Sequence, residues 1–133
     1  PRTLKVAEIS NDPPMNIFKG TKNYEKLNFE NILINSPSHF KNLSDQGYNF
    51  GIRASEIKLD DQGEEFEIEL AEISGSETLL HLKKGESKVI ALIEEVMNFK
   101  IHEKVKIKFN ENKLYAFDQN EELVSSPYGV SHG

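Results

Sequence analysis

Two glutamates on either side of a glycine are the first candidates for chemistry in this chain. Glu72 and Glu77 flank Gly75 in the segment Glu72-Ile73-Ser74-Gly75-Ser76-Glu77. Paired carboxylates can bind a metal ion or work as a general acid and base. The same spacing also fits a turn in which Gly75 takes a positive φ and both acids face solvent. We favour the turn, because no nucleophile–base or metal-ligand set accompanies the pair.

The other chemistry-bearing residue types show no functional spacing. The histidines are scattered along the chain, at His39, His81, His102 and His132, and there is no cysteine. The segment Lys84-Gly85-Glu86-Ser87-Lys88 lacks the glycine spacing of a phosphate-binding loop and is expected to lie in a hairpin. The sequence therefore predicts no catalytic residue, no metal site and no cofactor in this chain, and hence no enzyme activity.

Two further pairs each have a functional and a structural interpretation. Arg53 is followed three residues later by Glu56; Arg53 could dock a partner, but a local ion pair is the favoured interpretation. Phe117 is followed by Asp118 near the end of an apolar segment. We interpret Phe117 as a core anchor and Asp118 as the start of a turn, because Asp side chains often bond to the backbone two residues on.

The elements that position these residues are predicted to be strands. Phe66, Ile68 and Leu70 alternate with Glu65, Glu67 and Glu69, which is typical of a strand with one buried face. Similar short segments separated by turns predict a mainly all-β fold, an OB-like β-barrel with short helical turns. More specific expectations are a loop over 60–63, a bulge near Ala71, a strand buried on both faces at 89–93, a helical turn capped by Ser36 or Ser38, and another at 54–57.

Charge narrows the class of partner. The 133 residues carry a formal net charge of −6, and no Lys or Arg lies between Asp60 and Glu77. Such a surface repels the backbone of nucleic acids, so an OB-type nucleic-acid binder is disfavoured. No apolar run approaches the roughly 20 residues that a transmembrane helix needs.

Four segments, in the same order, resemble one known family. They are similar to the C-terminal regulatory domain, with its OB-like TOBE part, of the ATP-binding subunits of sugar-type ABC importers of the maltose and glycerol-phosphate kind. The segments are Val6-Ala7-Glu8 with Pro13-Pro14-Met15-Asn16, Gly51-Ile52-Arg53 with Glu56, Glu72 to Thr78, and Leu114 to Asp118. There are three departures: Ala54-Ser55 occupies the place of the family's Pro, Ser10-Asn11-Asp12 replaces a more usual Gly-Ser step, and residues 22–46 match no part of the pattern.

The resemblance implies a non-catalytic regulatory and dimerisation domain. Residues 1–14 would be a connector from an ATPase domain, 15–120 the TOBE domain and 121–133 a flexible tail. The ATP and Mg sites would belong to that ATPase domain, expected before Pro1. The implied partners are a second copy of the subunit, the membrane permease subunits through the parent's ATPase domain, and in some members a regulatory protein.

The implied location is the cytoplasm, peripheral to the inner face of the membrane. An alternative is a small-ligand TOBE domain that binds an oxyanion. Its usual Ser-Ala-Arg-Asn-type motif is not found in this sequence.

Overall fold

The computed structural model describes residues 13–29 and 32–130. Most of this part is β-strand, and its helical elements are short 3-10 turns. The strands form two antiparallel sheets, one of seven strands and one of four. The prediction of an all-β, OB-like fold with short helical turns is therefore confirmed. Among the described residues, no helix has the length and apolar character needed to cross a bilayer.

The chain divides into two compact units. The first combines the chain up to Ile52 with the chain from Glu111 onward, and the second runs from Arg53 to Asn110. The sequence predicted one domain over 15–120 followed by a flexible tail from 121. The tail prediction is wrong for residues 123–126, which form a strand of the seven-stranded sheet. The expected connector over 1–14 lies mostly outside the described residues.

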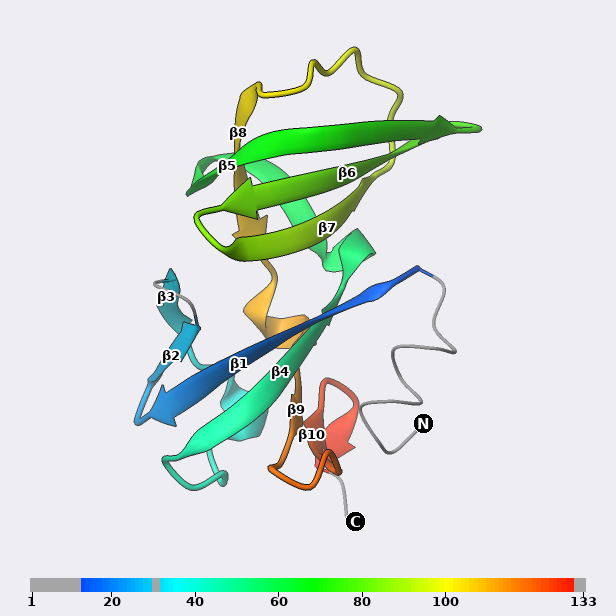
Figure 1. Ribbon diagram of the computed structural model, residues 1–133. Helices are drawn as coiled ribbons and strands as arrows, with labels where there is room; N and C mark the ends of the chain where they lie inside the picture. Colours follow the sequence, from blue (N-terminus) through cyan, green and yellow to red (C-terminus); the bar gives the residue numbers. More distant parts are fainter. Residues whose placement is uncertain (1–12, 30–31, 131–133) are drawn as a thin grey trace. The chain divides into compact units, whose positions relative to one another are not determined.

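The first unit holds the seven-stranded sheet, in the order β11-β10-β9-β4-β1-β2-β3 (Figure 1). Its core contains a row of aromatic rings: the ring centroids of Phe18 and Phe29 are 5.0 Å apart, and those of Phe40 and Phe50 are 5.8 Å apart. The strands are β1 (Met15–Asn23), β2 (Lys26–Phe29), β3 (Ile32–Asn35), β4 (Gly47–Arg53), β9 (Tyr115–Phe117), β10 (Leu123–Ser126) and β11 (Gly129–Val130).

A short 3-10 turn, η1 (Ser38–Phe40), confirms the predicted helical turn but not its cap. The N-cap residue is Pro37, with no side-chain cap hydrogen bond, and the buried hydroxyl of Ser36 has no hydrogen-bond partner. The turn is held from outside instead. The Oγ of Ser125 donates to the carbonyl of His39 (3.0 Å), and the ring of Phe40 is fully buried. A second such turn in this unit is η3 (Glu111–Lys113).

The hairpin between β1 and β2 turns at Tyr24, which has a φ of 58°. A positive φ is strained for an aromatic residue. Asp45 stabilises it: Oδ1 accepts hydrogen bonds from the Tyr24 amide (2.9 Å) and from Nζ of Lys22 (3.1 Å). These two donors, the Tyr24 amide first, lower the pKa of Asp45. The Lys22 side chain is only 5% exposed. The carboxylate that stabilises the turn is therefore also the partner of a largely buried ammonium group.

The second unit holds the four-stranded sheet, in the order β7-β6-β5-β8. Its buried face carries Phe66, Ile68, Leu80, Leu82 and Val89. The predicted helical turn after Arg53 is confirmed as η2 (Ala54–Glu56). The strands are β5 (Ile57–Ser74), β6 (Glu77–Lys84), β7 (Ser87–Ile93) and β8 (Lys104–Phe109).

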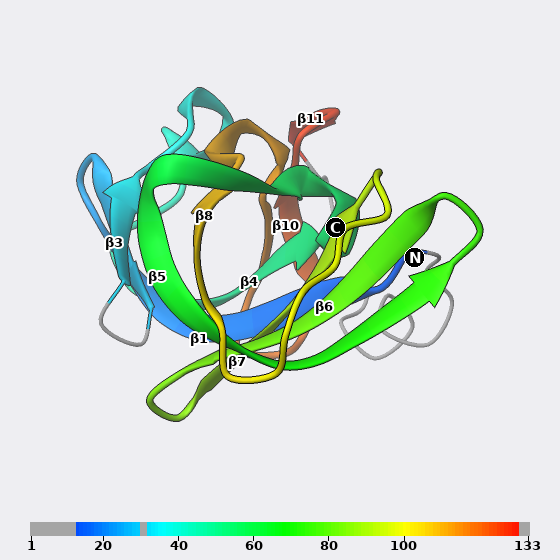
Figure 2. The same ribbon diagram turned by 90° about the horizontal axis from the view of Figure 1, so that it is seen from above.

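The predicted loop over 60–63 is wrong, because β5 runs through it. The pairing of β5 with β8 shifts register between Leu59 and Glu64, and β5 is strongly curved (Figure 2). Gly63 makes this possible. A Cβ there would lie 2.1 Å from the carbonyl oxygen of Ile107, so only a glycine lets the two backbones approach so closely.

A second register shift in β5, between Ile68 and Leu70 on the β6 side, agrees with the predicted bulge near Ala71 but comes slightly earlier. Consequently Leu70 does not share the buried face of Phe66 and Ile68; it is 44% exposed. The prediction that 89–93 is buried on both faces is also wrong. In β7 only alternate residues are buried, and Ile90 and Leu92 are half-buried on the opposite face.

Candidate functional site

The acidic pair of the β5–β6 turn is a turn feature. Gly75 has a φ of 61° and open space around it, as predicted. Glu72 pairs with a histidine, since its Oε1 lies 2.6 Å from Nε2 of His81. Glu77 lies opposite Ser74 in the hairpin. Within the described ranges, no group of three or more His, Asp or Glu side chains could hold a metal ion.

The other predicted residues have structural surroundings. Phe117 is 1% exposed and packs with Met15 in the first unit. Asp118 Oδ1 accepts hydrogen bonds from the amides of Asn120 (2.8 Å) and Glu122 (3.0 Å), so both predictions for this pair are confirmed.

The Arg53–Glu56 pair stays a prediction. Arg53 is half-buried at the end of β4. The carboxylate of Glu56 accepts a hydrogen bond from Nδ2 of Asn110 (3.3 Å).

The face of the four-stranded sheet opposite its core presents an apolar patch: Leu70, Leu79, Ile90 and Leu92. The register explains it. Leu70, His81 and Ile90 lie side by side on β5, β6 and β7, and so do Glu72, Leu79 and Leu92. Residues directly opposite in an antiparallel ladder project to the same face. The patch therefore surrounds the His81–Glu72 pair.

The same face continues into a charged region of both signs. Glu67 is its centre: Oε2 lies 2.7 Å from Nδ1 of His102, and Oε1 lies 3.6 Å from Nζ of Lys104. The hydrogen bond from His102 is the largest cause of the lowered pKa of Glu67. Nearby, Glu69 pairs with Lys88 at 3.3 Å. An apolar patch bordered by paired charges is an arrangement suited to binding another protein.

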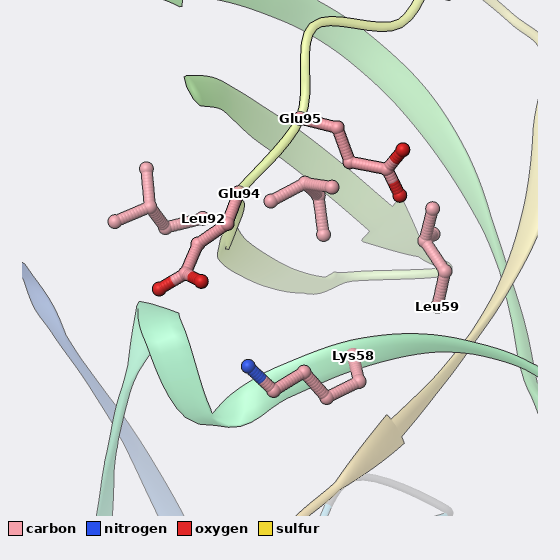
Figure 3. A pocket seen from close by; sticks show the side chains of 6 residues that line it. Lys58, Leu59, Leu92, Glu94 and Glu95 are labelled. Carbon is pink, nitrogen blue, oxygen red and sulfur yellow. The ribbon is translucent and has the colours of Figure 1, made fainter. Parts of the chain in front are cut away.

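A hollow of about 380 Å³ lies at the end of β7 (Figure 3). Lys58 and Leu59 of β5 form one side, and Leu92 to Glu95 form the other. Glu94 and Glu95 both project from the chain that leaves β7 (Figure 3). The hollow therefore combines an apolar lining with two carboxylates and one ammonium group.

The segment after β7, residues 94–103, is anchored at its two ends. At one end, Thr78 Oγ1 donates to the carbonyl of Glu95 (2.8 Å); at the other, the His102 amide donates to the carbonyl of Ile68 (2.7 Å). Between the anchors, Val96 is 54% and Ile101 58% exposed. Sequence reasoning did not select this segment. Its signal is a cluster of apolar residues without strand alternation, bordered by acids.

Neither the models of known protein families nor the curated proteins compared with this chain match it. The resemblance described above is therefore supported by the residues of this chain alone. The structure adds a role in the fold to some of them. Gly51 is one example: a Cβ there would lie 2.8 Å from Sδ of Met15 and 3.3 Å from the ring of Phe117.

Proposed function

We propose that this chain is a non-catalytic regulatory and dimerisation domain of the ATP-binding subunit of an ABC importer for sugars or related solutes. ATP hydrolysis would belong to a separate ATPase domain of the parent subunit. The partner of this chain would be a second copy of itself.

The observation that carries the proposal is the apolar patch of the second unit. Leu70 is 44% exposed, and three more aliphatic side chains accompany it on the same face. Charges of both signs border the patch. A two-fold axis brings identical surfaces together. A patch with an apolar centre and a rim of mixed charge can therefore meet its own copy without juxtaposing only like charges.

The order of the four family-like segments supports the transporter part of the proposal. Three of these segments lie wholly in the described residues. They include positions that the fold restricts to certain residue types: Gly75 has a positive φ, and the ring of Phe117 is buried. A direct check is the coding sequence before Pro1. The proposal expects it to encode a Gly-x-x-x-x-Gly-Lys-Ser/Thr phosphate loop; without one, the transporter assignment fails.

The dimerisation part is tested by solution mass. We expect light scattering of the purified chain to give twice the monomer mass at micromolar concentration. Leu70→Glu places a charge in the patch and should weaken the dimer by at least about tenfold, since a buried unpaired charge is costly.

The matched control is Leu33→Glu, because Leu33 is also an exposed leucine on a strand, 58% exposed on β3. This variant should remain dimeric. A monomeric wild-type chain, or equal weakening by both substitutions, would contradict the assignment of the patch.

A further inference from the structure

The hollow at the end of β7 has a neighbour within the second unit. A second hollow, of about 440 Å³, lies beside the anchored segment and shares Leu59 with the first. We call the two together the Leu59 groove. Its apolar lining comes from β5, β7, β8 and the segment between the last two: Leu59, Leu92, Ile93, Met97, Phe99 and Val105.

The border of the Leu59 groove is acidic. Five acids and three lysines line the two hollows, which gives a net charge of −2; they are Asp60, Asp61, Glu94, Glu95, Glu103, Lys58, Lys104 and Lys106. Within the described part of the chain, the carboxylates of Glu94 and Glu95 enter no ion pair or hydrogen bond. They are thus available to cations of a bound molecule.

The segment between β7 and β8 exposes apolar side chains: Val96 is 54%, Met97 37% and Ile101 58% exposed. Its ends are fixed by Thr78 and by the backbone of Ile68. Fixed ends lower the entropy that must be lost when a partner orders this segment. Methionine adapts its shape to different apolar groups, which suits a surface that receives a side chain from elsewhere.

We propose that the Leu59 groove binds a segment of another protein in which basic residues accompany apolar ones. The apolar side chains would contact Met97 and Leu59, and lysine or arginine would pair with Glu94 and Glu95. Charge complementarity selects this occupant, because the border repels acidic peptides and anionic lipid. The proposal goes beyond dimerisation and assigns an interaction surface for a different partner; this surface shares Leu92 with the apolar patch.

The test measures the fluorescence anisotropy of a labelled amphipathic peptide of leucine and lysine, titrated with the full chain. Glu94→Lys combined with Glu95→Lys should weaken its binding by at least about tenfold. The matched control is Glu121→Lys combined with Glu122→Lys, an adjacent exposed pair in the first unit, which changes the net charge equally and should change the affinity by less than about twofold. Met97→Ser should weaken binding independently of charge.

The proposal would be overturned by an absence of binding, by equal weakening with both double variants, or by equal binding of a peptide of leucine and glutamate. Binding of the chain to vesicles of anionic phospholipid through Val96 and Ile101 would also overturn it, in favour of a lipid surface. The light-scattering mass of the Glu94→Lys/Glu95→Lys variant separates this proposal from dimerisation. An unchanged dimer that no longer binds the peptide supports both.

Discussion

At the scale of single residues, Asp45 supports both a strained turn and a buried lysine. It accepts hydrogen bonds from the strained Tyr24 amide and from Lys22, whose side chain is 5% exposed. A buried ammonium group that loses its partner is strongly destabilising. The conformation of the first hairpin therefore depends on a carboxylate from a loop far along the chain.

We expect Asp45→Asn to destabilise the chain at neutral pH, because the amide keeps an acceptor for Tyr24 but removes the charge opposite Lys22. The folded-state pKa of Asp45 is lowered, so the carboxylate contributes stability above its unfolded pKa of about 3.9. That contribution is lost as the pH falls through the folded-state pKa.

Urea unfolding at about pH 7 and about pH 3 should therefore show a large difference between wild type and variant that shrinks in acid. Asp61→Asn, at an exposed position, is the control and should show little difference at either pH. If the wild type were more stable than Asp45→Asn by the same amount at both pH values, the role given to the Asp45 carboxylate would be wrong.

Residues whose role is local were predictable from sequence, and residues whose role is long-range were not. Gly75 and Asp118 act within their own turns, so their types alone indicated the structure. Lys22 and Asp45 are 23 positions apart, and neither type nor spacing marks them. The turn at Tyr24 was missed for the same reason, because Tyr-Glu is not a typical hairpin turn and its support comes from Asp45.

At the scale of elements, β5 determines the shape of its sheet. It pairs with β8 along its first half and with β6 along its second, with a register shift in each pairing. Gly63 lies at the first shift, against the backbone of Ile107. Extra residues at such shifts increase bending and twist, which agrees with the curvature of β5 in Figure 2.

We expect Gly63→Ala to lower the free energy of unfolding by about 1–3 kcal/mol, because its Cβ would collide with backbone atoms that cannot move aside. Gly47→Ala is the control. Its nearest neighbour would be the flexible Nε2 of Gln119 at 3.2 Å, so its effect should stay within about 0.5 kcal/mol. Chemical denaturation measures both, and equal effects would refute the role given to Gly63.

Alternation of apolar residues predicted the strands but not their continuity. The run Asp60-Asp61-Gln62-Gly63 has no apolar residue, so a loop was expected; pairing with β8 resumes at Glu64 and keeps β5 continuous. The apolar run at 89–93 led to the opposite error. It predicted burial on both faces, whereas Ile90 and Leu92 are half-buried and belong to the apolar patch. Both errors arise where tertiary pairing, or a half-buried apolar patch on the face opposite the core, overrides the local pattern.

At the scale of the whole molecule, the second unit is one continuous segment and the first is not. The two parts of the first unit meet where β4 pairs with β9, with Phe50 opposite Ala116. The second unit carries its own buried face, including Phe66, Leu80 and Ile107. The sequence predicted a single OB-like domain and not this division, because no Pro/Gly-rich linker marks either boundary between the two units.

We expect the segment 53–110, expressed alone, to fold, because four strands with a buried face suffice for independent stability. The segment 13–52 should not fold alone, since it lacks β9 and with it the ring of Phe117, which packs against Met15. Dispersion of amide signals in NMR spectra distinguishes the two outcomes. An unfolded 53–110 would show that the second unit depends on the rest of the chain.

The pairing of β4 with β9 also orders events during synthesis on the ribosome. β4 emerges before the whole second unit, and β9 emerges after it. At about 5–20 residues per second, the edge of β4 waits on the order of seconds for its neighbour. The second unit can fold during that interval, whereas the first is completed only when the last strands arrive. A ribosome pause just after Asn110 would thus lengthen the time for which the β4 edge is open to other chains.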